Sequence, residues 1–278
     1  MSKNAKLILS IMSRFALHSV PRSGSSWVGA VLNNHPEINY FFQPLFSNSF
    51  APTLTDKSAY EDIIKFYDEL RNTNDSFVQQ LRFGEQNHLR NKDSNNILYK
   101  EVRYHHIVEN LLQKDPTIKI IGLIRNPLGV INSWLKAPKE FRRDLKWNEL
   151  DEWKNAHKKN LGKEEEFNGF NKWKETTLLF ERLSTMYPDN FYLIQYSELL
   201  QNTTIAFEGI LNHLNLEMHE DMLSFLDKTK STAINNLDSY SIHRIKSLDD
   251  GWKTQLNPII VKAIQNELKD SVLEKYLL

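Results

Sequence analysis

The stretch FALHSVPRSGSSWVGAVLNNHP, residues 15–36 of the 278-residue chain, restricts the possible folds more than any other segment. Residues 15–20 are an apolar run of strand length, and residues 21–26 are a turn rich in serine. The apolar residues after the turn recur at helical spacing up to a His-Pro pair, which disfavours further helix. The pattern predicts a strand, a tight turn and a helix in succession.

The predicted turn, residues 21–26, has the features of an anion-binding loop, and we call it the cradle. A turn before a helix directs backbone N–H groups and the positive end of the helix at one point. Gly24 lies at the centre of this turn. A positive charge and hydroxyl donors come from Arg22, Ser23, Ser25 and Ser26. We therefore expect the cradle to bind a phosphate or sulfate group.

Further apolar runs of strand length predict a larger sheet. They cover residues 97–102, 119–124 and 190–196, and segments with helical periodicity lie between them. Strands that alternate with helices favour a parallel sheet that is covered on both faces. We therefore predict an α/β, P-loop-like, three-layer fold with a central parallel sheet, in a single domain of residues 1–278.

One highly charged segment, residues 136–174, interrupts this alternation. It carries three tryptophans among its charges, Trp147, Trp153 and Trp173. Two interpretations are open. The segment is either a solvated helical excursion that the tryptophans anchor, or a helical lid over a substrate pocket.

The composition excludes several classes of function. Lysine and arginine together number 35, as do aspartate and glutamate, so no overall positive field attracts nucleic acid or an acidic membrane. The absence of cysteine excludes disulfides, thiolate catalysis and cysteine-bound zinc. The apolar run of residues 7–12 is too short to span a membrane, and no pair of carboxylates stands out as a metal site. We expect a cytoplasmic protein that binds neither nucleic acid nor a metal, with no particular oligomeric state indicated.

The cradle differs from the common nucleotide-binding loops. A Walker A loop needs a glycine, four further residues and then Gly-Lys-Ser or Gly-Lys-Thr. Here no glycine precedes Pro21, and Arg22 stands before Gly24 where a lysine would follow it. The GxGxxG pattern is missing too. A P-loop kinase or nucleotide hydrolase, and a non-catalytic nucleotide-binding protein on the same scaffold, stay open as alternatives.

Four segments resemble the sulfotransferases that depend on 3′-phosphoadenosine 5′-phosphosulfate (PAPS), and they occur in the family's order. The first is PRSGSSW, residues 21–27, with the His-Pro pair that follows its helix. The others are Arg125-Asn126-Pro127 with Ser133, the turn Tyr196-Ser197-Glu198-Leu199, and HRIKSLDDGWK from His243 to Lys253. The cradle is most similar to that of carbohydrate-type and bacterial members.

The resemblance implies transfer of a sulfuryl group from PAPS to a hydroxyl or amine, with 3′-phosphoadenosine 5′-phosphate (PAP) as product and no metal. The 5′ end of the donor would lie in the cradle, where Arg22 would also neutralise charge on the leaving oxygen. The 3′-phosphate would lie on Arg125, because a guanidinium can bind phosphate bidentately. The other implied donor contacts are Trp27, which would stack on adenine unless it anchors the core, Ser133, Tyr196, Arg244 and Lys246.

The acceptor must lose a proton to a general base, and here the chain departs from the family. Many carbohydrate-type members have a glutamate before the proline of the segment after His-Pro, but this chain has Gln43-Pro44, and an amide is no base. Cytosolic members use a histidine near the end of the next strand, where this chain reads KEVRYHH. We predict Glu101 as the base, unless it forms an ion pair at the strand end, with His105 and His106 behind it.

The identity of the acceptor is left open by the sequence. Residues 40–46 are rich in aromatic side chains, and the segment of residues 136–174 carries tryptophans. Such surfaces suit a small molecule, a carbohydrate or a lipid alike.

Overall fold

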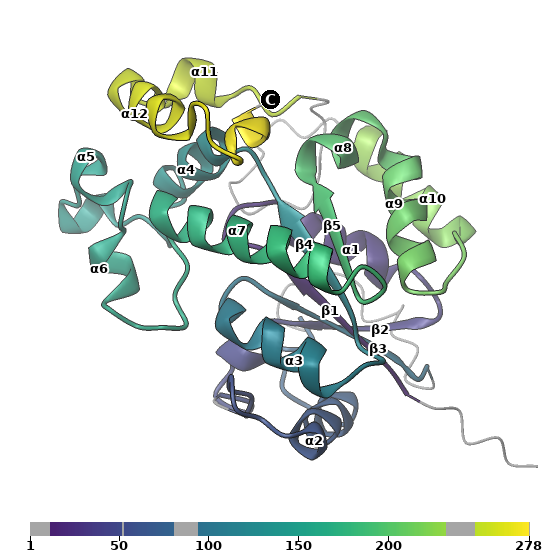
Figure 1. Cartoon of the computed structure of the whole chain (residues 1–278). Helices are drawn as coiled ribbons and strands as arrows, with labels where there is room; N and C mark the ends of the chain where they lie inside the picture. The colour runs from purple at the N-terminus through teal and green to yellow at the C-terminus, as the bar shows by residue number, and fades with distance from the viewer. Residues whose placement is uncertain (1–11, 52, 81–93, 232–247, 278) are drawn as a thin grey trace, which may run out of the picture.

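Five parallel strands form the centre of the structure, a computed structural model that describes residues 12–51, 53–80, 94–231 and 248–277. Their order across the sheet is β2-β3-β1-β4-β5, so β1 lies in the middle (Figure 1). The strands are β1 (Ser13–His18), β2 (Ile38–Phe42), β3 (Asn96–Glu101), β4 (Lys119–Ile124) and β5 (Phe191–Gln195). The predicted α/β fold with a central parallel sheet is confirmed.

The register of the strands brings the carboxyl ends of the three central strands together. His18, the last residue of β1, pairs with Glu101 at the end of β3 and with Gly122 in β4. From β1 the chain continues to β2 and β3 on one side of the sheet, and then crosses to β4 and β5 on the other side. In open parallel sheets, ligands lie outside the carboxyl ends of the strands at the point where the strand order reverses in this way. The loops after β1, β3 and β4 are therefore where a site is expected.

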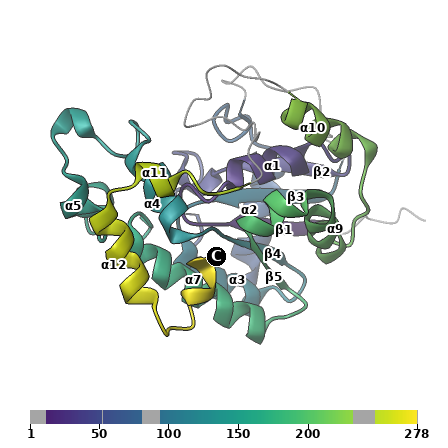
Figure 2. The same cartoon turned by 90° about the horizontal axis from the view of Figure 1, so that it is seen from above.

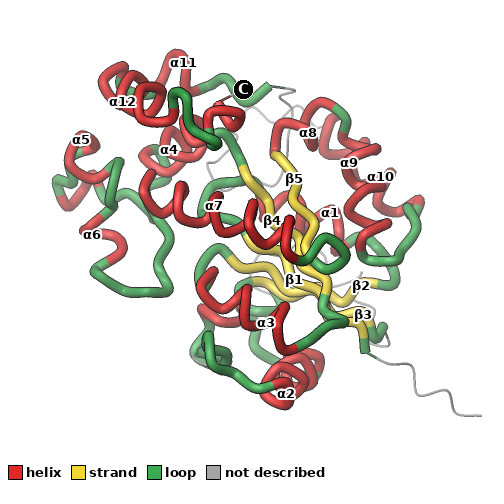
Figure 3. The backbone as a smooth tube through the Cα atoms, in the orientation of Figure 1, coloured by secondary structure: helices red, strands yellow, loops and turns green. Residues whose placement is uncertain are grey.

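Helices cover both faces of the sheet, as Figures 2 and 3 show. One face carries α1 (Ser25–Asn33), α9 (Thr203–His213) and α10 (Glu220–Ser231), and α8 (Tyr196–Gln201) follows β5 directly. The other face carries α2 (Tyr60–Arg71), α3 (Val108–Lys114), α4 (Pro127–Leu135), α7 (Phe170–Met186) and α12 (Pro258–Leu268). In the described ranges, no helix combines the length and the apolar character that a membrane crossing needs.

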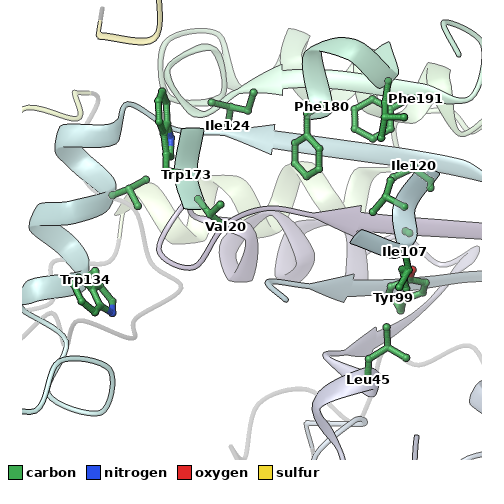
Figure 4. Packing of buried hydrophobic residues seen from close by; sticks show 14 of the residues in the cluster. Val20, Leu45, Tyr99, Ile107, Ile120, Ile124, Trp134, Trp173, Phe180 and Phe191 are labelled. Atoms are coloured by element: carbon green, nitrogen blue, oxygen red, sulfur yellow. The ribbon is translucent and has the colours of Figure 1, made fainter. Parts of the chain in front are cut away.

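A separate buried apolar cluster fills the space on each side of the sheet. Successive side chains of a strand point to opposite faces. In β4, Ile120 accordingly belongs to the cluster under α7, whereas Ile121 belongs to the cluster under α1. Figure 4 shows part of the first cluster, with Phe180 of α7 close to Phe191 of β5.

Residues 136–174 contain short helical turns joined by loops. Their elements are the 3-10 turn η4 (Arg143–Leu145), α5 (Glu149–Glu152), α6 (His157–Asn160) and the start of α7. Trp153 and Trp173 pack against Phe170, with ring centroids 5.7 and 5.9 Å from the centroid of its ring. These two tryptophans join the segment to the core, and a lid role for the segment stays a prediction.

The remaining elements are short. They are η1 (Pro44–Phe46), η3 (His105–Ile107), α11 (Trp252–Gln255) and η5 (Glu274–Leu277). Of these, η1 follows β2 and η3 lies soon after β3, so both lie near the carboxyl edge of the sheet.

Candidate active site

The cradle joins β1 to α1 and directs the start of that helix at the carboxyl edge of the sheet. Gly24, with φ 93° and ψ 5°, is the left-handed residue just before α1, and no side chain of the described residues caps the helix. The Gly24 carbonyl accepts from the N–H groups of Trp27, at 3.0 Å, and Val28, at 3.2 Å. The N–H groups of Ser25 and Ser26 come before these bonds and have no acceptor within the helix, as an anion-binding site requires.

Two buried hydroxyls at the cradle lack a hydrogen-bond partner among the described residues. They belong to Ser23 and to Ser19, which the sequence analysis did not select. A buried hydroxyl without a partner costs about 1–3 kcal/mol, whereas an anionic oxygen could accept from it. Ser25 is also buried, and Ser26 is half-buried. These groups fit the phosphosulfate end of the donor that the resemblance implies.

Arg22 connects the cradle to α4. Its Nε donates to the Oγ of Ser133 at 3.1 Å, and its backbone carbonyl accepts from Nη1 of Arg125 at 2.7 Å. Arg22 holds a φ of 72°, a left-handed conformation that costs a residue with a Cβ about 1–2 kcal/mol. The structure thus brings together three residues that the sequence analysis assigned to opposite ends of the donor.

Arg125 is held at the start of α4 by contacts on the edge and the face of its guanidinium. Nε and Nη2 donate to the carboxylate of Asp249 at 2.7 and 2.5 Å, and the ring centroid of Tyr196 lies 4.9 Å from Cζ. Burial by itself would lower the pKa of Arg125, but the hydrogen bond and charge of Asp249 outweigh it, so the pKa is raised. Asp249 was not selected from the sequence, because an acid in a polar segment has the pattern of a solvated surface residue.

The start of α4 has the capping chemistry that an Asn-Pro pair favours. Asn126 caps the helix, with its Oδ1 accepting from the N–H of Leu128 at 2.9 Å, and Pro127 occupies the first turn. The indole N–H of Trp173 donates to the carbonyl of Arg125 at 2.9 Å. In Figure 4, Trp173 lies near Ile124, at the end of β4. The backbone of Arg125 is therefore fixed from two sides.

Tyr196 lies between the cradle and Arg125. Its ring is so close to Gly24 that a Cβ at this glycine would collide with it. Trp27 packs behind, with its ring centroid 6.3 Å from that of Tyr196 and 5.7 Å from that of Phe207. The indole of Trp27 is 3% exposed and belongs to the core, so its stacking on adenine stays a prediction.

The end of β3 places a buried lysine beside the strand that leads into the cradle. Lys100 is 1% exposed, and its Nζ lies 4.3 Å from the ring centroid of Phe42. Burial lowers the pKa of Lys100 to about 7, and the charge of Arg22 acts in the same direction. Lys100 is a second cation near Arg22, which the sequence analysis did not select because strand alternation alone does not tell which neighbours a lysine meets.

Glu101 has one satisfied and one unsatisfied carboxylate oxygen. Oε1 accepts from the N–H of Leu45 at 2.8 Å, while Oε2 is buried with no partner in the described part of the chain. An ion pair with Arg103 is not formed, because Arg103 pairs with Glu166 at 3.2 Å. Burial raises the pKa of Glu101 to about 8, against the opposing effect of Lys100. A carboxylate with this pKa is suited to take up a proton near neutral pH.

His105, the second predicted base, lies among core side chains. Its ring centroid is 4.4 Å from that of Phe167, and its Nδ1 lies 3.1 Å from Nδ1 of His18. Nε2 of His18 in turn lies 3.1 Å from the hydroxyl of Tyr99. Burial lowers the pKa of His105 well below its usual value, so the ring is neutral at pH 7. These surroundings are those of a packed side chain, and a catalytic role for His105 stays a prediction.

Aromatic and cationic groups flank the ends of β2 and β3. Gln43, with a φ of 42°, donates its backbone N–H to the carbonyl of Lys100 at 2.8 Å. The rings of Phe42 and Phe46 each pack edge to face on Phe77, at 5.5 and 5.7 Å between centroids. The Cζ of Arg103 lies 3.9 Å from the ring centroid of Phe46. We call these three phenylalanines the aromatic wall.

Two expectations from the sequence remain, the donor contacts in the segment before Asp249 and the lack of a metal site. Arg244 and Lys246, predicted as donor contacts, lie outside the described residues. Within the ranges that the structure covers, no group of histidine, aspartate and glutamate side chains could hold a metal ion.

Solved structures of sulfotransferases share this fold. Mouse sulfotransferase SULT7A1, solved as a complex with PAP, matches with a TM-score of 0.56 at 15% identity, over 95% of this chain and 87% of its own. The sulfotransferase domain of the Synechococcus PCC 7002 olefin synthase matches with a TM-score of 0.52 at 17% identity, over 92% and 94%. The sulfotransferase domain of the curacin biosynthetic pathway matches with a TM-score of 0.54 at 18% identity, over 93% and 98%. At these identities the similarity shows the fold alone.

The comparison with protein families is more specific. A search of curated protein sequences found no significant match. The model of the sulfotransferase domain family, however, matches residues 13–275, which include the cradle, Arg125, Ser133 and Tyr196. The chain therefore belongs to the sulfotransferase domain family, as its resemblance to the PAPS-dependent sulfotransferases predicted.

Proposed function

We propose that the chain transfers a sulfuryl group from PAPS to a hydroxyl or amine of a small acceptor. The connection between two cationic anchors, Arg22 in the cradle and Arg125 before α4, carries this proposal. The carbonyl of Arg22 accepts from Arg125, and the side chain of Arg22 donates to Ser133. A nucleotide with anionic groups at both its 5′ and 3′ ends matches this pair, whereas ATP carries all of its phosphates at one end.

The cradle supplies the groups that the 5′ end of the donor needs. The first N–H groups of α1 would bind the phosphosulfate, together with the hydroxyls of Ser19 and Ser23, which have no partner among the described residues. An oxygen or nitrogen of the acceptor would bond to sulfur while the bond from sulfur to the bridging oxygen breaks and its electron pair stays with the 5′-phosphate. Arg22 and protonated Lys100 are the cations that would stabilise this charge. Positioning and charge account for such a transfer without a covalent enzyme intermediate.

The acceptor is proposed to lie on the β3 side of the cradle. Arg125 and Asp249 occupy the β4 side, and the aromatic wall lies on the other side, at the end of β2. Glu101 is the proposed base there, since its buried Oε2 has no partner among the described residues. A small molecule, a carbohydrate or a lipid could place its hydroxyl at this position.

Incubation of the purified protein with PAPS and a panel of phenol, sugar and lipid acceptors tests the proposed activity. We expect PAP to appear only with acceptors that become sulfated, and calorimetry to show tighter binding of PAP than of ATP. Preference for ATP with release of phosphate would favour a kinase or nucleotide hydrolase. Tight PAP binding with no transfer to any class of acceptor would favour a non-catalytic protein.

Glu101→Gln is expected to lower kcat about 100-fold while PAP affinity stays close to that of the wild type. The base must be ionised and burial raises the pKa of Glu101, so kcat should fall toward acid pH. Lys100 must be charged and burial lowers its pKa, so kcat should also fall toward alkaline pH. The two groups interact, so each limb reports an apparent pKa of the pair. A pH profile of kcat should therefore be bell-shaped, losing its acid limb in Glu101→Gln and its alkaline limb in Lys100→Met.

Glu109, a carboxylate away from the proposed site, provides the control for Glu101→Gln. Glu109→Gln removes a carboxylate of α3 that pairs with Arg182, and it should leave kcat and the pH profile unchanged. Unchanged kcat in Glu101→Gln would remove Glu101 as the base, and His105 would then be the next candidate.

We further propose a cytoplasmic location, a single domain, and closest relation to the carbohydrate-type and bacterial members. The form of the cradle, Arg-Ser-Gly-Ser-Ser, supports the relation to carbohydrate-type and bacterial members. The absence of cysteine is compatible with a cytoplasmic location.

A further inference from the structure

The carboxylate of Asp249 lies at the position where an external anion would be expected. It accepts two hydrogen bonds from the guanidinium of Arg125, at 2.7 and 2.5 Å. It also lies against Gly129, in the first turn of α4, where a Cβ would collide with it. Asp249 is 14% exposed and Arg125 16%, so the pair is largely shielded from water.

The surroundings of Asp249 are those of an anion site. They combine a guanidinium fork, the amino end of the nine-residue helix α4, and a glycine that lets an anion approach the backbone closely. The anion in this structure is a side chain of the chain itself, separated from Arg125 by 124 residues of sequence. The same arginine is the proposed partner of the donor's 3′-phosphate.

We propose that Asp249 is an internal competitor for the 3′-phosphate: it leaves Arg125 when the donor binds and returns when PAP departs. This inference rests on the proposed function, because it assumes that a 3′-phosphate binds at Arg125. It goes beyond that function by assigning Asp249 a role in donor affinity and in product release.

Simultaneous binding of both anions is disfavoured by the contacts of Arg125. Two edges of its guanidinium are engaged, by Asp249 and by the carbonyl of Arg22, and Tyr196 lies over one face. A phosphate brought next to Asp249 would also place like charges together at a site with little water to screen them. The 3′-phosphate therefore needs the place that the carboxylate holds.

The chain around Asp249 is built so that the carboxylate can withdraw. Residues 248–250 have no regular secondary structure, and α11 begins only at Trp252. The carbonyl of Asp250 accepts from the N–H of Lys253 at 2.9 Å. A rearrangement at Asp249 therefore breaks no helix or strand in the part of the chain that the structure describes.

A competing carboxylate affects nucleotides selectively. A nucleotide with a 3′-phosphate can bind fully only to molecules in which Asp249 has left Arg125. Its apparent affinity is therefore its intrinsic affinity multiplied by the fraction of such molecules. A nucleotide without a 3′-phosphate does not need Arg125, so its affinity is not reduced. Release of PAP is also assisted, because Asp249 takes over the hydrogen bonds that the phosphate gives up.

Calorimetry with PAP and with adenosine 5′-monophosphate (AMP), which differs only by the missing 3′-phosphate, tests this inference on the full chain. Asp249→Asn keeps the shape of the side chain and removes its charge. We expect it to bind PAP about tenfold more tightly and to release PAP about tenfold more slowly, with AMP affinity unchanged. Asp250→Asn is the matched control, and should bind both nucleotides as the wild type does.

The outcomes separate this inference from the proposed function. If the wild type prefers PAP to AMP but Asp249→Asn binds PAP no more tightly, the competitor role is wrong while the donor assignment stands. If no variant prefers PAP to AMP, the assignment of the 3′-phosphate to Arg125 is wrong, and the inference falls with it. Should Asp249→Asn not fold, judged by loss of AMP binding, Asp249→Ser gives the same comparison.

Discussion

Replacing Arg125 with alanine is expected to weaken PAP binding by about two orders of magnitude while AMP binding changes little. The guanidinium is largely buried and is held by the ring of Tyr196 and the carbonyl of Arg22, while Trp173 holds the backbone carbonyl of Arg125. It is thus ready to bind a phosphate without first losing side-chain freedom, and its loss removes a desolvated, charge-assisted contact. Arg22→Ala should weaken PAP and AMP alike, since both carry the 5′-phosphate that the cradle would bind.

Arg182→Ala is the matched control for these two variants. Arg182 also makes a bidentate pair with a carboxylate, that of Glu109, at 2.6 and 2.7 Å, but this pair joins α7 to α3 on an exposed face. Its loss should leave the affinity for both nucleotides unchanged, because it lies on a helix face that carries none of the proposed donor contacts. Wild-type PAP affinity in both Arg22→Ala and Arg125→Ala would overturn the assignment of the donor site.

Removal of Arg125 also leaves Asp249 without its partner, so the measured loss of PAP affinity combines a lost contact with a new repulsion. An uncompensated carboxylate in a shielded site repels the incoming 3′-phosphate and can destabilise the fold. The double variant Arg125→Ala/Asp249→Asn removes both charges together. PAP affinity in the double variant should recover in part, by the amount of repulsion, and should stay below that of Asp249→Asn alone.

The cradle and the sheet could be predicted from the sequence because their signals are local. A strand, a glycine-containing turn and an amphipathic helix follow one another within residues 15–36, and β3, β4 and β5 coincide with the predicted runs of strand length. The strand β2, in the aromatic-rich segment, was not among the predicted strands. The cap at Asn126 was also predictable, since the Asn-Pro pair acts on its own helix. Arg125 then had to lie at the sheet edge, because it follows a strand directly.

The contacts that define the site's chemistry are not local and could not be predicted. Asp249 meets Arg125 across 124 residues. The burial of Lys100 and Glu101 depends on what packs on each face of β3, and nothing in the run KEVRYHH states this. His105 illustrates the same limit, because His18 and Phe167, its neighbours in space, come from distant parts of the chain. Candidate bases were therefore recognisable by residue type and strand position only.

Replacing Gly24 with alanine is expected to damage both ends of the donor site at once. Its φ of 93° costs a residue with a Cβ about 1–2 kcal/mol, and overpacking against the ring of Tyr196 costs about 1–3 kcal/mol more. Urea unfolding should show a fall in the free energy of unfolding of about 3 kcal/mol. Tyr196 also covers the guanidinium of Arg125, so a ring displaced from Gly24 no longer supports that arginine, and PAP affinity should fall sharply.

Gly162→Ala separates the two causes of this loss. Gly162 has a φ of 70°, and no atom of the described residues lies within 4 Å of the Cβ that alanine would add. The control shares the backbone cost of about 1–2 kcal/mol but has no collision, so it should keep full PAP affinity. Equal losses of stability in the two variants would show that backbone conformation alone requires glycine at position 24. A loss of PAP affinity confined to Gly24→Ala would instead identify the contact with Tyr196 as a link between the cradle and Arg125, since this ring contacts both.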